Sequence, residues 1–139
     1  RGREFSRREK LVTESWLPSH KEVYKTIKII SEIISRDELR QMAAAGFGDM
    51  VKAVVDVKRE MMAVDAELHA DEETLLLEDG SRQEDLWGIN LYPELKGQEF
   101  VEFDSMINMR PSQHNKSRGV ENEAIRNRII QIVGKRVQV

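Results

Sequence analysis

The stretch MVKAVVDVKREMMAVDAEL, residues 50–68, decides the fold. Its first half is rich in β-branched residues, a polar triplet interrupts it at 58–60, and an apolar run then returns, so the stretch predicts a β-hairpin. Successive side chains of a strand point to opposite faces. We therefore expect the return strand to carry Asp65, Glu67 and His69 on one face and apolar side chains on the other.

A helix is predicted immediately before the hairpin, over residues 36–45. Ser35 and Glu38 have the spacing of a capping box, and Gly46 is a natural stop. Upstream, TIKIISEII at 26–34 favours a strand because of its isoleucine content, although the same stretch also shows helical spacing.

The remaining elements complete a β-α-β-β-α-β-β-α order. This order predicts a single α+β domain, with a mainly antiparallel sheet of about five strands and two to three helices packed on one face. We place the domain at residues 26–139. Residues 1–25 are interpreted as an N-terminal extension, native or introduced by cloning, that is disordered or docked by Trp16. The later predicted elements are a helix at 71–79, strands at 87–93 and 99–111, and a helix at 122–133.

Composition excludes several classes of protein. The chain has no cysteine, which rules out disulfides and thiolate metal sites and favours a reducing compartment. No apolar run approaches the roughly 20 residues that span a bilayer, so we expect no membrane segment and a cytoplasmic protein. Residues 56–104 hold 4 basic and 15 acidic side chains, which argues against general nucleic-acid binding. Residues 105–139 hold 7 basic and 2 acidic side chains and leave a local phosphate contact open.

Five segments carry a resemblance to a known family. They are FGDMVKAVVDV (47–57), ELHADEETLLLEDGS (67–81), LWGINLYPE (86–94) and EFDSMINMRPSQ with NKSRGVE (102–113, 115–121). Over about residues 27–134 the chain resembles a family of short prokaryotic proteins catalogued as a domain of unknown function. The resemblance implies a shared fold and carries over no catalytic residue.

The first candidate site is the acidic face of the return strand. Glu102 and Asp104 share a face of the later strand, and Asn90 with Tyr92 could join them from the strand between. If these faces coincide, carboxylates and one imidazole could hold Mg²⁺, Mn²⁺ or Fe²⁺ or do acid–base work. The simpler interpretation is a solvated polar face. The candidate catalytic residues are Glu67, His69, Glu102 and Asp104, and the candidate metal ligands are Asp65, Glu67, His69 and Asp104.

The second candidate site is RPSQHNKSRGVEN at 110–122, which leads into the last predicted helix. Free backbone N–H groups at a helix start, with arginines nearby, can bind a phosphate or carboxylate. A solvated polar loop is the alternative. The candidate ligand-binding residues are Arg110, Ser112, Gln113, Asn115 and Arg118.

Three hypotheses for function follow. The first is a binding or regulatory module for a small anionic ligand or a protein partner. The second is a small metal-assisted hydrolase of phosphorylated substrates that uses the acidic face and a divalent metal. The third is a homo-oligomer formed through a sheet edge or the Trp16 segment. The sequence ranks the binding module slightly ahead of the enzyme and leaves open whether the protein is an enzyme at all.

Overall fold

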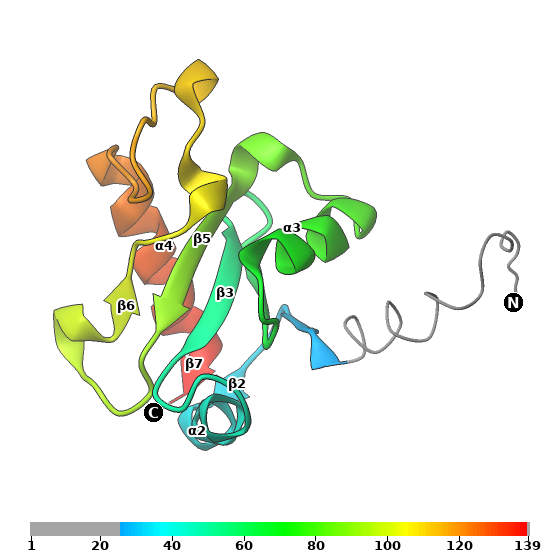
Figure 1. Ribbon diagram of the computed structural model, residues 1–139, viewed down its shortest axis with the longest axis vertical. Coiled ribbons are helices and arrows are strands. Elements are labelled where there is room, and N and C mark those ends of the chain that lie inside the picture. Colours follow the sequence, from blue (N-terminus) through cyan, green and yellow to red (C-terminus); the bar gives the residue numbers. More distant parts are fainter. Residues whose placement is uncertain (1–25, 139) are drawn as a thin grey trace, which may run out of the picture.

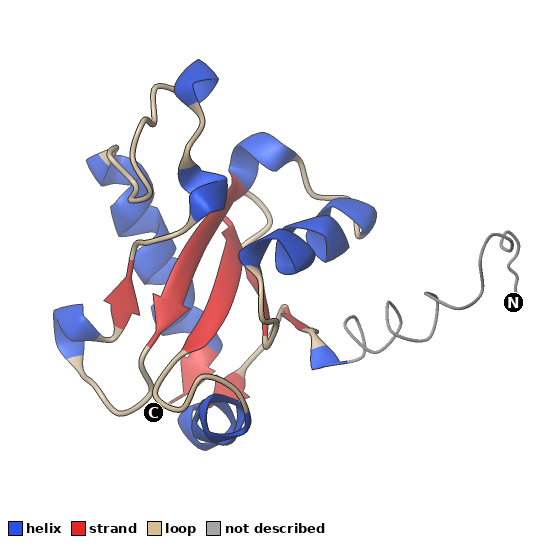
Figure 2. Ribbon diagram, in the orientation of Figure 1, coloured by secondary structure: helices blue, strands red, loops and turns tan. Residues whose placement is uncertain are grey.

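A five-stranded antiparallel sheet forms the centre of the computed structural model, which describes residues 26–138 (Figure 1; Figure 2). The strand order across the sheet is β1-β4-β3-β5-β6, and every neighbouring pair is antiparallel. Two further strands, β2 and β7, pair in parallel as a separate small sheet. The strands are β1 Lys28–Ile30, β2 Ile34–Ser35, β3 Val51–Asp56, β4 Met61–Val64, β5 Leu86–Leu91, β6 Val101–Glu102 and β7 Val137–Gln138.

Helices cover both faces of this sheet. The helices are α2 Arg36–Ala45, α3 His69–Glu78 and α4 Glu123–Arg136. Apolar residues of α2 and α4 share one core cluster with Val55, whereas Leu76 of α3 packs in a second cluster with Val54. Because adjacent strand residues point to opposite faces, α3 lies on the face opposite α2 and α4 (Figure 1). The α+β fold and its five-stranded antiparallel sheet are as predicted. Two of the helices, α2 and α4, share one face of the sheet, as expected. The third helix, α3, covers the other face, so that face is not simply exposed to solvent.

The predicted start of the first helix is confirmed in detail. The Ser35 side chain accepts a hydrogen bond of 3.0 Å from the backbone N–H of Glu38, and α2 ends before Gly46. The strand that precedes this helix differs from expectation. Residues 26–34 do not form one strand but divide into β1, which joins the main sheet, and β2, which pairs with β7.

The hairpin is confirmed, but its return strand is shorter than predicted. β3 and β4 pair with Val55 opposite Met62, and the turn lies at residues 57–60. β4 ends at Val64, because Asp65 adopts a left-handed conformation with φ 79°. His69 begins α3, two residues before the predicted helix start. The expected strand face carrying Asp65, Glu67 and His69 is therefore wrong.

The predicted strand over 99–111 is also mostly wrong. After the two residues of β6, the chain forms short 3₁₀ turns, η3 Met106–Asn108 and η4 Pro111–Gln113. The Asn108 side chain replaces a strand partner: its Oδ1 accepts from the Gly88 N–H at 2.8 Å, and its Nδ2 donates to the Gly88 carbonyl at 2.9 Å. A Cβ at Gly88 would lie 2.5 Å from Ser105, so this close approach requires glycine.

The last helix begins as predicted and runs further than predicted. The Asn122 side chain accepts from the Ile125 N–H at 3.0 Å and caps α4. The expected end at residue 133 is wrong, since α4 continues past Gly134 to Arg136, whose Nε donates to the Glu60 carbonyl at 2.8 Å. This tertiary contact holds the final turn against the hairpin.

None of the helices described between residues 26 and 138 is long and apolar enough to cross a membrane. The predicted extension at 1–25, including Trp16, lies outside the described residues. The turns η1 Gln83–Asp85 and η2 Gly97–Glu99 complete the description.

Candidate functional site

A row of polar side chains crosses one end of the sheet on the face that α3 covers. Lys52 of β3 lies opposite Asn90 of β5, and Asn90 lies opposite Glu102 of β6. Cross-strand partners have their Cβ atoms only about 5 Å apart. Three polar residues from three strands are thus neighbours at the edge of an otherwise apolar layer.

Hydrogen bonds connect most of this row. Glu102 Oε1 accepts from Asn90 Nδ2 and from the Tyr92 hydroxyl, each at 2.9 Å. The bond to Glu102 is the main reason that the pKa of Tyr92 rises to about 12. Asn90 is buried, and its Oδ1 has no hydrogen-bond partner in the structure. The row therefore contains a buried acceptor that is still unused.

His69 lies beside this row at the start of α3. Its Nε2 is 2.7 Å from the Ile89 carbonyl, which can only accept, so Nε2 carries the proton and Nδ1 is left as an acceptor. Burial lowers the pKa of His69 to about 4, and the positive charges of Lys52 and Arg118 act in the same direction. The imidazole is thus neutral at pH 7.

The helix start beside His69 has no side-chain cap. Leu68 occupies the N-cap position, where a hydroxyl or carboxylate would usually accept a backbone N–H. The first N–H groups of a helix lack partners within the helix and carry partial positive charge. The start of α3 consequently presents unfilled donors.

Arg118 reaches the same place from the long loop that precedes α4. Its Nε is 2.6 Å from Asp104 Oδ1, and the two side chains are about half exposed. Asn108 holds this part of the loop by donating to the Arg118 carbonyl at 2.9 Å. The same asparagine that pairs with Gly88 therefore positions Arg118.

These elements enclose a cavity of about 180 Å³, named the His69 cavity here. Its walls come from β3, the start of α3 and the loop between β6 and α4. The lining residues are Lys52, Leu68, His69, Ala70, Ser105, Met106, Ile107 and Arg118.

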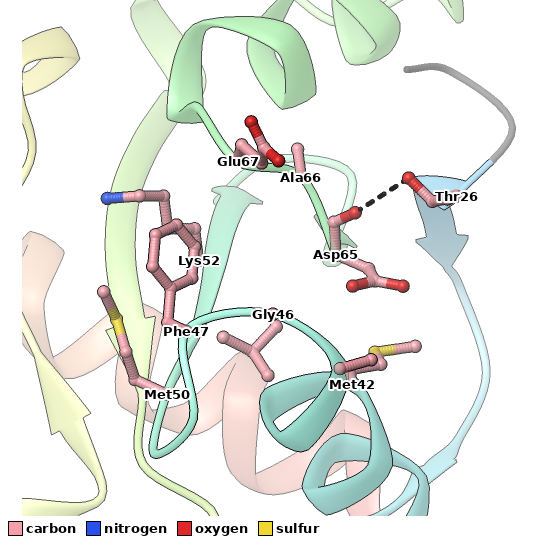
Figure 3. A pocket seen from close by; sticks show the side chains of 11 residues that line it. Thr26, Met42, Gly46, Phe47, Met50, Lys52, Asp65, Ala66 and Glu67 are labelled. Carbon is pink, nitrogen blue, oxygen red and sulfur yellow. Dashed lines mark hydrogen bonds between the residues drawn. The ribbon is translucent and has the colours of Figure 1, made fainter. Parts of the chain in front are cut away.

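A second cavity, of about 220 Å³, adjoins the first at Lys52, which lines both. This Asp65 cavity lies between the end of β4 and the loop after α2 (Figure 3). The Lys52 ammonium lies 5.2 Å from the centroid of the Phe47 ring, and the two side chains run side by side in Figure 3. The other lining residues are Thr26, Met42, Ala45, Gly46, Met50, Val51, Asp65, Ala66 and Glu67.

Asp65 combines an unusual backbone with a perturbed carboxyl group. Its φ of 79° is uncommon for a residue with a side chain, and burial raises its pKa. Thr26 donates a hydrogen bond of 3.2 Å to the Asp65 carbonyl and so holds the turn (Figure 3). The side chains of Asp65 and Glu67 give this cavity acceptor character next to the basic His69 cavity.

A family model described as Protein of unknown function (DUF5674) matches residues 28–136. The chain belongs to this family. The resemblance over about 27–134 is thereby confirmed. No curated protein and no solved structure matches the chain.

The structure of this DUF5674 protein brings together part of both predicted sites. His69, from the predicted acidic face, and Arg118, from the predicted anion loop, line one cavity. Asp104 binds Arg118, and Glu102 joins the adjoining row through Asn90. Asn90 and Tyr92, which could join Glu102 if the strand faces coincided, both donate hydrogen bonds to it. Asp65 and Glu67 line the neighbouring cavity instead.

The other residues of the predicted anion loop hold the DUF5674 fold together instead. Arg110 is buried, stacks 4.1 Å from the Trp87 ring centroid and donates to the carbonyls of Gln83 and Leu86. Asn115 is buried and donates to the carbonyls of Asn108, Ser117 and Gly119. Gln113 Nε2 donates to the Glu84 carbonyl at 3.1 Å, and Ser112 is exposed.

The predicted metal ligands are not gathered into one group. Within residues 26–138, no cluster of three or more histidine, aspartate or glutamate side chains is placed to hold a metal ion. Asp65 and Glu67 line one cavity, and His69 lines the other. The divalent metal stays an untested alternative.

Sequence reasoning missed Lys52, which joins the two cavities, and Phe47, which lies against it. A signal for Lys52 was present, since it is the only charged residue of the run MVKAVV at 50–55. A lysine inside a buried strand requires a reason for its position, because charged side chains are seldom buried without a partner.

Proposed function

We propose that this protein is a binding module for a small anionic ligand, whose phosphate or carboxylate group occupies the His69 cavity between Lys52 and Arg118. The observation that carries the proposal is the convergence of these two cations from separate segments on one cavity. Lys52 is half-buried and forms no ion pair with any residue among 26–138. An anion would supply the missing countercharge.

The start of α3 adds to this positive potential. The N–H groups of His69 and Ala70 lie in the first turn, and both residues line the cavity. No side chain caps this turn, so an anionic group placed there would take the acceptor role that an N-cap residue normally plays. The start of α3 and the two cations would therefore all attract the same anionic group.

Arg118 remains able to bind an incoming anion despite its contact with Asp104. The contact uses Nε, which leaves the two terminal nitrogens of the guanidinium as donors. Exposed ion pairs of this kind contribute about 0–1 kcal/mol, so the Arg118 side chain can reorient at little cost. Asp104 then serves to hold the arginine near the cavity.

The neutral His69 narrows the chemistry of the ligand. Nδ1 has no hydrogen-bond partner among the described residues and can only accept at pH 7. A ligand with an O–H group beside its charge, such as monohydrogen phosphate or a hydroxy acid, would satisfy both the cations and this nitrogen. The acceptors Asp65 and Glu67 in the adjoining cavity favour a further donor on the rest of the ligand.

The direct test is calorimetric titration of the full chain with inorganic phosphate and with O-phosphoethanolamine, which adds an ammonium donor. Lys52→Gln and Arg118→Gln should each weaken binding about tenfold, because each removes one charge-assisted contact. Matched controls are Lys58→Gln and Arg82→Gln, which change exposed cations away from both cavities and should leave binding unchanged. Equal binding by all four variants would refute the site, and no binding of either anion would refute the proposal and leave the protein partner.

The alternative is a metal-assisted hydrolase of phosphorylated substrates at the same place. It is favoured by Asp104, whose charge acts on His69 and whose carboxylate contacts Arg118. Two results together would favour the hydrolase over the binding module. The first is stabilisation of the protein by Mg²⁺ or Mn²⁺ that disappears in Asp104→Asn, and the second is hydrolysis of a phosphate monoester.

A further inference from the structure

A larger cavity lies on the opposite face of the sheet, beside β6 and α4. Its volume of about 560 Å³ falls within the roughly 300–1,000 Å³ of small-molecule sites. Phe103 and Val137, which line it, also pack against the main core cluster. This Arg126 cavity is lined by Arg36, Gly97, Gln98, Phe100, Val101, Phe103, Arg126, Ile130, Val133, Gly134 and Val137. The lining is mostly apolar and contains no acidic side chain.

Two arginines provide the charge of the Arg126 cavity. Arg36 stacks 4.3 Å from the Phe100 ring centroid and donates through Nη1 to the carbonyls of Pro93 and Leu95. Arg126 donates through Nη1 to two backbone carbonyls, at 2.7 and 3.0 Å. Neither arginine forms an ion pair within residues 26–138, and each keeps Nε and Nη2 available. Both guanidinium groups are thus held in place while their charge stays uncompensated.

Gly134 is a lining residue of the Arg126 cavity that carries no side chain. It lies inside α4, where glycine is about 1 kcal/mol less favourable than alanine. Its φ is not positive, and a Cβ built on it would meet nothing within 4 Å. Neither backbone conformation nor packing therefore requires glycine. Its effect is to leave the cavity wall open where a side chain would project.

We propose that the Arg126 cavity binds a small amphipathic carboxylic acid. The apolar chain of the acid lies between Phe103, Val133 and Gly134, and its carboxylate meets Arg126. An apolar body suits the lining, and a single negative charge suits guanidinium groups that already share their positive charge with backbone carbonyls. This site is separate from the His69 cavity and does not depend on the function proposed for it.

The test is calorimetric titration of the full chain with decanoate below its micelle concentration, compared with 1-decanol as a neutral probe of equal chain length. Decanoate should bind, and decanol should bind at least about tenfold more weakly because it lacks the charge. Arg126→Gln should weaken decanoate about tenfold and leave decanol unchanged. Equal binding of the two probes to the parent chain would overturn the proposal.

Variants of Gly134 can fill the cavity without preventing the protein from folding. Gly134→Leu places a side chain in the cavity, while Gly134→Ala adds only a methyl group, and both residues favour a helix more than glycine does. Both variants should therefore fold. Gly134→Leu should weaken decanoate at least about tenfold and Gly134→Ala by less than about threefold.

Two results would overturn the proposal at this step. The first is equal decanoate binding by the two Gly134 variants, which would place the probe elsewhere. The second is a parent chain that light scattering shows to be a dimer and that Gly134→Leu converts to a monomer, which would make the cavity a contact between copies. Lys52→Gln changes a residue that lines the His69 cavity and not the Arg126 cavity, so it should leave decanoate binding unchanged. The two proposed sites can therefore be tested separately.

Discussion

Replacing Asn108 with alanine should destabilise this protein strongly, although Asn108 lies in a short 3₁₀ turn outside the sheet and the α-helices. Its side chain is fully buried and forms three hydrogen bonds, two with the backbone of Gly88 in β5 and one with the Arg118 carbonyl. Asn108→Ala leaves the buried N–H and C=O of Gly88 without partners. Each buried polar group left unpaired costs about 1–3 kcal/mol. For the two groups of Gly88 the expected loss is therefore about 2–6 kcal/mol.

Urea unfolding followed by circular dichroism measures this loss. Domains of this size have unfolding free energies of about 5–15 kcal/mol and urea slopes of about 1–3 kcal/mol per molar. A loss of about 3 kcal/mol should therefore lower the midpoint by roughly 1–3 M. Asn127→Ala is the matched control, because Asn127 is exposed on α4 and alanine suits a helix.

A loss below about 1 kcal/mol for Asn108→Ala would refute this reasoning. It would mean that the loop before α4 does not depend on the Asn108 carboxamide. The same variant should also weaken phosphate binding, because the Arg118 backbone loses one of its attachments. Phosphate affinity that stays at the parent value would separate the loop anchor from the proposed site.

Three further predictions concern buried groups near the site. Burial raises the pKa of Glu72 well above its usual value, so the folded state favours the protonated carboxyl, and its contribution to stability is present below pH 4.5 and lost as pH rises. Glu72→Gln should therefore be more stable than the parent at pH 8 and equal to it at pH 4, and equal stability at pH 8 would contradict this. Burial lowers the pKa of His69 to about 4, so its contribution is present above pH 6.5 and falls by up to about 3 kcal/mol toward pH 4. His69→Gln should lose that pH dependence. Denaturant titrations at pH 7, 5.5 and 4 measure the unfolding free energy, and a variant whose stability falls toward pH 4 as steeply as that of the parent would contradict this prediction. Gly88→Ala should destabilise by about 1–3 kcal/mol, since its Cβ would lie 2.5 Å from Ser105; an unchanged melting temperature would contradict the close approach.

The elements that the sequence determined by itself are those whose signals are local. The Ser35 cap, the stop at Gly46 and the turn of the hairpin depend on residues within a few positions of one another, and the structure reproduces each of them. The return strand of the hairpin ends at Val64, short of the predicted end. Hydrogen bonds between a cap and its own first turn, and pairing across a short turn, form without help from distant segments. The α+β class follows from these elements and was therefore predictable.

The site was only half predictable because its parts belong to different segments. The sequence identified His69 and Arg118 but assigned them to two separate sites, on a strand and a loop. It placed Arg110 and Asn115 among the ligand-binding residues because polar loops before helices often bind anions. In the structure, Arg110 is buried against Trp87 and donates to the Leu86 carbonyl, and Asn115 is buried and donates to the Asn108 carbonyl. Both side chains therefore stabilise the fold. Only folding decides whether a polar side chain faces a ligand or the chain itself.

Tertiary structure alone decided where β4 ends, which conformation residues 103–122 adopt and how long α4 is. The left-handed Asp65, whose carbonyl accepts a hydrogen bond from Thr26, turns the chain into α3. The Asn108 carboxamide takes the place of a strand beside Gly88. Arg136 extends α4 past Gly134 by reaching the Glu60 carbonyl. In each case a contact between residues distant in sequence outweighs a local preference of about 1 kcal/mol. Such contacts also bring Lys52 to Arg118 and leave the Arg126 cavity open, and a linear pattern contains neither arrangement.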